Sequence, residues 1–135
     1  MKVKVKVPAT SANLGPGFDV AGLALTLYNT FTFELNEGGL NITGCPTQFC
    51  NEENLTYQAF SQAAQSCGLD FKGVNIHCES QVPYTRGLGS SSTCIVAGIV
   101  GAFAFKDKTD DRQEILELAT KIEGHPDNVA PAIFG

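Results

Sequence analysis

The sequence predicts an α+β fold, with a mixed or antiparallel sheet and packed helices, and three observations support this prediction. Apolar and polar residues alternate in two early segments, 3–7 and 30–35, as they do in strands with one buried face. Apolar residues then recur at helical spacing between Leu55 and Cys67. Residues 90–105 form an apolar run that is too long for an ordinary strand, which favours a buried helix.

The first strands are predicted from a period of two. Val3, Val5 and Val7 alternate with lysines, and aromatic and aliphatic residues alternate with polar ones over 30–35. Gly38 and Gly39 indicate a turn, and residues 40–43 are then predicted to form a short strand that pairs back on the preceding one.

The clearest helix covers 55–67, with Asn51 or Asn54 as its N-cap and Gly68 as its C-terminal stop. Alternation then returns at residues 74, 76 and 78, which predicts another strand. The apolar run 90–105 is predicted to be a central helix whose small residues let its neighbours pack closely. A last helix over about 111–123 is expected to be capped by Thr109 or Asp110 and ended by Gly124.

Composition excludes several classes of protein. A net charge of -5, with no cluster of Lys or Arg, argues against a nucleic-acid partner. No apolar run reaches the roughly 18 residues that a membrane span needs, and no signal peptide is evident, so the chain is expected to be cytoplasmic. The five cysteines have no C-x-x-C spacing, which favours reduced, mostly buried thiols over a zinc site.

The segment 82–93 leads from a strand through Gly87 and Gly89 into three serines at the start of the apolar run. Glycines let the main chain approach a ligand, and the first turn of a helix offers unpaired N–H donors to an anion. The segment therefore suggests a phosphate-binding loop, although it lacks the Lys of a Walker A motif and the third glycine of a Rossmann motif.

Two further segments accompany this loop. Residues 8–19 read PATSANLGPGFD and follow the first strand, and residues 123–135 read EGHPDNVAPAIFG and follow the last helix. With the serine-rich loop between them, these segments resemble the GHMP kinases, and among these the homoserine kinases most closely. The chain departs from that pattern at Thr93, where the family more often has Ala, and it stops inside the third segment at about half the usual length.

The resemblance implies a fold like domain 2 of ribosomal protein S5 for residues 1–135, as an ATP-binding N-terminal domain that is incomplete at its C-terminal end. A second, ferredoxin-like domain would be absent. The implied reaction is ATP-dependent phosphorylation of L-homoserine to O-phospho-L-homoserine, a step of threonine biosynthesis, with Mg²⁺ as the metal. The full-length family is expected to form homodimers. Another small-molecule acceptor, or an inactive nucleotide-binding fragment, remains an alternative.

The resemblance also implies roles for individual residues. The nucleotide would be bound by Asn54, Pro83, Arg86, Gly87, Leu88, Gly89, Ser90, Ser91 and Ser92. Homoserine would be bound by Asn13, Asp19 and His125. The metal would be held by Ser91 and Glu123, and the catalytic set would be Glu123, Asp127 and Asn128.

The residue types also bear on the roles of Glu123 and Asp127, and they suggest one alternative class of enzyme. Glu123 stands at a helix C-terminus, where an acid faces the negative end of the dipole, and such a local conflict is typical of a functional position. Asp127 is the one local candidate for a general base. The serines with His125 and Asp127 also suggest a serine hydrolase, but the loop is not a G-x-S-x-G elbow.

Overall fold

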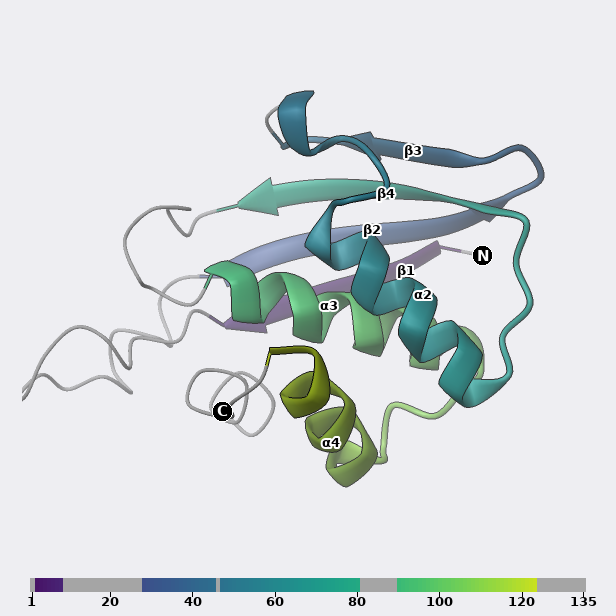
Figure 1. Ribbon diagram of the computed structural model, residues 1–135, viewed down its shortest axis with the longest axis vertical. Coiled ribbons are helices and arrows are strands. Elements are labelled where there is room, and N and C mark those ends of the chain that lie inside the picture. The colour runs from purple at the N-terminus through teal and green to yellow at the C-terminus, as the bar shows by residue number, and fades with distance from the viewer. Residues whose placement is uncertain (1, 9–27, 46, 81–89, 124–135) are drawn as a thin grey trace, which may run out of the picture.

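A four-stranded sheet with helices on one face forms the body of the protein, as seen in the computed structural model (Figure 1). The structure describes residues 2–8, 28–45, 47–80 and 90–123. Within them the elements are β1 (Lys2–Pro8), β2 (Tyr28–Asn36), β3 (Leu40–Thr43), the 3₁₀ turn η1 (Thr47–Phe49), α2 (Leu55–Cys67), β4 (Gly73–Ser80), α3 (Ser90–Phe105) and α4 (Arg112–Glu123). The predicted α+β class is confirmed.

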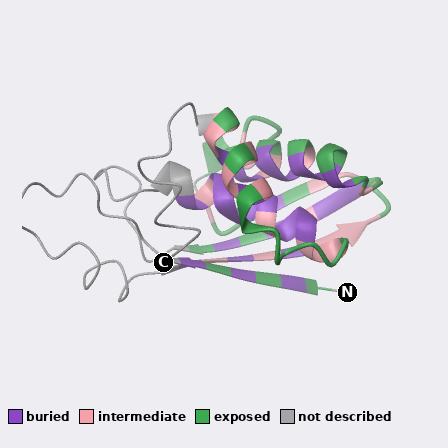
Figure 2. Cartoon of the chain, turned by 90° about the horizontal axis from the view of Figure 1, so that it is seen from below, coloured by how far each residue is buried: buried purple, intermediate pink, exposed green. Residues whose placement is uncertain are grey.

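The strands have one apolar face because their apolar residues alternate with polar ones. Val3, Val5 and Val7 of β1 are buried together with the inward residues of β2 and β4, whereas His77 and the β1 lysines are exposed. Figure 2 shows the helices stacked on the buried side of the sheet. β1 and β2 pair antiparallel, as do β2 and β4, so the mixed sheet has its antiparallel part on the β1 side.

β3 is present over the predicted residues, but the prediction of its partner was wrong. It pairs in parallel with β4, which lies between β2 and β3 in the sheet. Gly73, the first residue of β4, fits against Gly39 and the Asn36 side chain, where any Cβ would clash with the backbone of the turn. Asn36 Oδ1 also accepts hydrogen bonds from the N–H groups of Gly38 and Gly39. Glycine at 73 thus allows β4 to enter beside β2.

Helix α2 has the ends that its sequence predicts. Asn54 is the N-cap, since its Oδ1 accepts from the N–H groups of Thr56 and Tyr57 at 2.9 and 3.2 Å. Gly68 ends the helix in the left-handed region at φ 77°, and the N–H of Leu69 closes the last turn on Ala64 O.

Helix α3 is central, as predicted. Gly98 brings it against the backbone of α2 at Thr56, and Gly101 brings it against the ring of Phe33 in β2. Phe33 in turn stacks on Phe60 of α2, with ring centroids 5.4 Å apart. The small residues of α3 therefore fix how closely helix, helix and sheet approach. In the part of the chain that is described, no helix is both long and apolar enough to cross a membrane.

Helix α4 packs on α3, and its predicted cap was one or two residues too early. Asp111 is the cap, because its Oδ1 accepts from the N–H of Glu114 at 3.0 Å and its carbonyl accepts from Ile115. Asp110 instead accepts from the N–H of Arg112 with its carbonyl, in the turn before the helix. Gly124 lies outside the described residues.

Candidate nucleotide-binding site

One edge of the sheet gathers the ends of the strands that carry two of the three motif segments. In the antiparallel register, Pro8 at the end of β1 lies opposite Tyr28 at the start of β2. Asn29, the next residue of β2, lies opposite Ser80 at the end of β4. The chain therefore leaves β1 toward segment 9–27, and leaves β4 toward segment 81–89, from the same edge.

Helix α3 begins at this edge as well. Asn29 Nδ2 donates a hydrogen bond of 2.9 Å to Thr93 Oγ1, and both side chains are at most 1% exposed. Thr93 belongs to the first turn of α3, so this buried bond joins the start of the helix to the start of β2. Sequence reasoning missed this pair, although Thr93 was visible as a departure from the family's alanine.

The third motif segment starts from the same side. Helix α4 ends at Glu123, on the side of the molecule where α3 begins, and the two helices pack together (Figure 1). The first turn of an α-helix has N–H groups without an intrahelical acceptor and the positive end of the helix dipole, and both attract an anion. The described elements thus bring an anion-attracting helix start and the end of an acid-terminated helix to one side of the domain.

Many predicted site residues lie outside the described part of the chain. They are Asn13, Asp19, Pro83, Arg86, Gly87, Leu88, Gly89, His125, Asp127 and Asn128. The backbone of Ser90, Ser91 and Ser92 forms the start of α3, and that of Glu123 the end of α4. Their predicted contacts stay predictions.

Asn54 is the one predicted nucleotide-binding residue whose side chain is described. Its side-chain oxygen, Oδ1, caps α2, and its Nδ2 donates to the backbone carbonyl of Phe49 at 2.9 Å. Phe49 and Leu55 beside it are 46% and 40% exposed. Asn54 therefore has a clear structural role, and its predicted contact with a nucleotide is a separate question.

The fold also brings together thiols from the segment after β3 and from β4. Cys45 Sγ lies 3.2 Å from Cys50 Sγ. Burial, reinforced by the hydrogen bond with Cys50, raises the pKa of Cys45 to about 11. Burial likewise raises the pKa of Cys78 to about 12, with the neighbouring thiols of Cys45 and Cys94 adding to the shift. Sequence spacing gave no sign that Cys78 lies near Cys45, because their approach arises from the pairing of β3 with β4.

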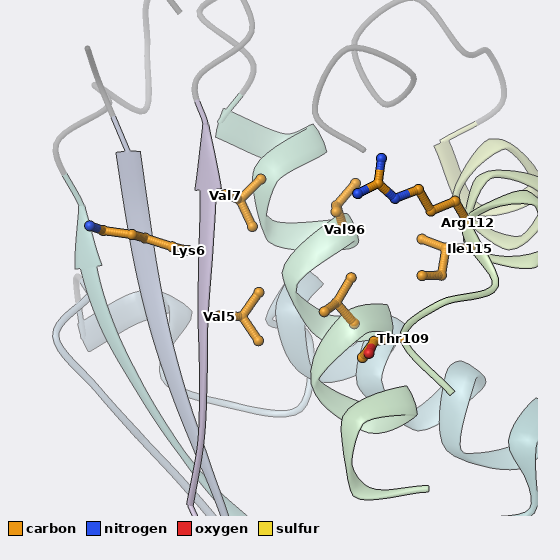
Figure 3. Close-up of a pocket in the computed structure, with 8 residues that line it drawn as sticks. Val5, Lys6, Val7, Val96, Thr109, Arg112 and Ile115 are labelled. Atoms are coloured by element: carbon orange, nitrogen blue, oxygen red, sulfur yellow. The ribbon is translucent and has the colours of Figure 1, made fainter. Parts of the chain in front are cut away.

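A separate cavity of about 170 Å³ lies between β1, α3 and α4 (Figure 3). Val5 and Val7 point into it from β1, while Lys6 points to the other face of the sheet. Five of its eight lining residues are aliphatic, and its volume is below the roughly 300 Å³ at which small-molecule pockets begin. It therefore does not fit a nucleotide. In the described residues, no group of three or more His, Cys, Asp or Glu is arranged to hold a metal ion.

Comparison with known proteins agrees with the motifs. The N-terminal domain of the GHMP kinases matches residues 54–135. A homoserine kinase of Clostridium beijerinckii is 53% identical over 98% of this chain, which spans 45% of that relative's length.

Solved structures support the same assignment. A homoserine kinase from Cytophaga hutchinsonii superimposes with a TM-score of 0.74 at 26% identity, over 99% of this chain and 46% of the other. A D-glycero-D-manno-heptose 1-phosphate kinase from Bacteroides thetaiotaomicron shares the fold, with a TM-score of 0.76 at 22% identity, over 100% of this chain and 54% of the other. With the domain match covering more than half of its residues, this chain belongs to the GHMP kinase family.

Proposed function

We propose that this chain is the ATP-binding N-terminal domain of a homoserine kinase, which transfers the γ-phosphoryl group of ATP to the hydroxyl of L-homoserine. The observation that carries the proposal is the 53% identity to a homoserine kinase across nearly the whole chain. The chain spans about half the length of the curated relatives it matches, so the complete reaction is proposed for the longer protein.

The nucleotide would be held mainly by backbone groups. Phosphoryl transfer depends on positioning and on neutralising charge rather than on covalent chemistry by the protein. The loop around Gly87 and Gly89, together with the N-terminus of α3 at Ser90, would direct N–H donors toward the phosphates. Each such helix start is worth roughly 0.3–1 kcal/mol toward an anion, so several donors must act together.

The residues proposed for Mg²⁺ suit that ion. Mg²⁺ prefers one or two carboxylates or hydroxyls together with phosphate oxygens. Ser91 and Glu123 offer one hydroxyl and one carboxylate, from the start of α3 and the end of α4. When bound, the ion would neutralise charge on the phosphates.

The acceptor would be recognised as a zwitterion with a free hydroxyl. The Asp19 carboxylate would pair with the ammonium group, while Asn13 and His125 would orient the amino acid. Orientation would bring the hydroxyl in line with the γ-phosphate. Asp127 would accept the hydroxyl proton if a base takes part, and Asn128 would complete the catalytic set.

Calorimetry with Mg-ATP, run beside an assay of L-homoserine-dependent ADP release, tests the proposal on the 135-residue chain. Binding together with release would support the whole proposal. Binding without release would restrict this chain to the nucleotide-binding part, and binding of neither Mg-ATP nor ATP would contradict it.

Substitutions separate the two ligands. Loss of Glu123 as a metal ligand in Glu123→Gln should weaken Mg-ATP binding by at least the roughly 10- to 100-fold typical of outer-shell partners. Asp19→Asn should leave Mg-ATP binding unchanged. It should raise the activation free energy that governs kcat/KM for L-homoserine by about 2 kcal/mol or more, which lowers kcat/KM roughly thirtyfold or more. If Asp19→Asn lowered turnover of an acceptor without an ammonium group, such as mevalonate, by the same factor, Asp19 would not be the ammonium partner and the choice of homoserine would lose this support.

A further inference from the structure

The segment between β3 and α2 holds two thiols side by side. Cys45 and Cys50 flank η1, and both are half-buried. Their sulfurs are 3.2 Å apart, and the thiol of Cys50 also points to the carbonyl of Cys45 at 3.6 Å. The thiols belong to one short turn, in which the N–H of Cys50 donates to Thr47 O at 3.1 Å.

Both ends of this turn are fixed to the body of the protein. Gly44 has φ 86° and lies so close to the backbone carbonyl of Cys78 in β4 that a Cβ would clash. At the other end, Asn51 Nδ2 donates to Gln48 O and Asn54 Nδ2 donates to Phe49 O, each at 2.9 Å. The backbone on either side of the two cysteines is therefore held in place, and this keeps the two sulfurs close together.

We propose that Cys45 and Cys50 form a dithiol that closes to an intramolecular disulfide when the protein meets an excess of a low-molecular-weight disulfide such as oxidised glutathione. One cysteine thiolate attacks a sulfur of the reagent, forms a mixed disulfide and releases one glutathione thiol. The second cysteine, as its thiolate, then attacks the protein sulfur of that mixed disulfide and releases the other glutathione thiol. The protein loses two protons and two electrons, and the reagent gains them.

The geometry favours this pair over the alternative partner, Cys78. A disulfide needs an S–S length of about 2.05 Å, so the two sulfurs must approach by only roughly 1.2 Å from their separation of 3.2 Å. Cys78 lies on a strand that is paired on both sides and is only 5% exposed. Burial raises the pKa of Cys78 to about 12 and that of Cys45 to about 11, so both carry little thiolate near neutral pH, and the greater exposure of Cys50 is what favours it over Cys78 as the partner of Cys45.

Peptide mapping of the oxidised chain tests the proposal. The chain is incubated with excess oxidised glutathione at about pH 8.5, where more thiolate is present than at neutral pH, then alkylated and digested with chymotrypsin without reduction. Chymotrypsin cuts after Phe49, which separates the peptide of Cys45 from that of Cys50 unless a disulfide joins them. We expect the two peptides to stay joined, with two of the five thiols lost and both recovered on reduction.

Matched variants assign the bond. Cys45→Ser and Cys50→Ser should each carry a mixed glutathione disulfide on the remaining cysteine, whereas Cys67→Ala should form the joined peptides like the unmodified chain. A bond from Cys45 to Cys78, persistent mixed disulfides on both cysteines of the unmodified chain, or five thiols that stay free would overturn the proposal.

Discussion

At the scale of single residues, the side chain of Asn54 joins η1 to α2 because it forms hydrogen bonds with both. It accepts from the first turn of α2 and donates to the carbonyl of Phe49. We predict that Asn54→Ala lowers the free energy of unfolding by about 1 kcal/mol, the usual cost of removing an N-cap. Urea unfolding followed by circular dichroism measures this loss.

Asn54→Asp is the matched control, because it keeps the capping oxygen and adds a charge that suits a helix N-terminus. It should retain most of the stability that Asn54→Ala loses. Equal losses in both variants would mean that the bond to Phe49, and not the cap, holds this end of α2. If Asn54 also contacts the nucleotide, as the family resemblance implies, Asn54→Asp should weaken Mg-ATP binding while leaving stability nearly unchanged.

Cys78 links stability to alkaline pH. Its pKa is about 9 in the unfolded chain and about 12 in the folded protein, so the folded state keeps a proton that the unfolded state releases. Its contribution is complete below about pH 9 and is lost as the pH rises toward about 12. We predict that the urea midpoint falls as the pH is raised from 9 to 11.

Other groups also titrate in this range, so a variant isolates the thiol. Cys78→Ala will be less stable at every pH, but its urea midpoint should fall less steeply above pH 9 than that of the unmodified chain. Identical slopes in the two proteins would assign the alkaline effect to other residues.

The residue-scale predictions from sequence succeeded where one candidate had the right spacing. Gly68 was identified as a helix stop because an achiral residue follows the last apolar position. The N-caps were harder, since Asn51 and Asn54 are chemically equal, as are Asp110 and Asp111. Only the path of the backbone, with Asn51 committed to Glu53 and Gln48, decides which side chain reaches the helix.

At the scale of elements, Gly98 sets the distance between α2 and α3. Ala is normally the better helix former by about 1 kcal/mol. Here a Cβ at residue 98 would clash with the carbonyl of Thr56 and lie 2.8 Å from Ala59 Cβ. We therefore predict that Gly98→Ala lowers stability by about 1–3 kcal/mol, the usual cost of overpacking, as measured by urea unfolding.

Gly38→Ala serves as the control for this substitution. A Cβ at residue 38 meets nothing within 4 Å, and its φ is not in the left-handed region. This variant should differ from the unmodified chain by less than about 0.5 kcal/mol. A Gly98→Ala protein that is more stable than the unmodified chain would show that α2 and α3 can separate without loss.

The bond between Asn29 and Thr93 joins α3 to β2. In Thr93→Val the shape is kept but the hydroxyl that accepts from Asn29 is lost. We predict a loss of about 1–3 kcal/mol, because the Asn29 amide remains buried without this partner. Thr93→Ser keeps the hydroxyl and should lose about 1 kcal/mol or less, for one methyl group. Equal losses in the two variants would argue that the methyl group matters and the hydrogen bond does not.

Most elements could be predicted from periodicity, because burial of one face requires it. The neighbours of β3 could not. Its pairing with β4 depends on contacts such as Ile42 with Ile76, which lie 34 residues apart. A three-residue link from β2 to β3 suggests a hairpin, and only the pairing of β4 with β2 on one side and β3 on the other shows that a strand lies between them.

At the scale of the whole molecule, the fold explains how motifs from three parts of the sequence can serve one site. The sequence predicted the motifs from residue types, but the strand register and the bond between Asn29 and Thr93 decide that the described ends of β1 and β4 and the start of α3 lie on one side of the molecule. Two lysines lie at the opposite end of the molecule. Lys72 directly precedes β4, and Lys108 follows α3 at the end away from Ser90. Both lysines are exposed, so the molecule carries cleavage sites at the end away from the proposed site.

This arrangement makes protection from trypsin a test of where Mg-ATP binds. With Mg-ATP at about ten times its Kd, we predict that cleavage after Arg86, in the proposed phosphate loop, slows about tenfold, because the ligand leaves only a tenth of the sites free. Cleavage after Lys72 and Lys108 should keep its rate, and Mg²⁺ alone should protect none of the three. Equal slowing at all three sites would indicate general stabilisation of the fold. An unchanged rate at Arg86, in a protein that binds Mg-ATP by calorimetry, would place the nucleotide elsewhere.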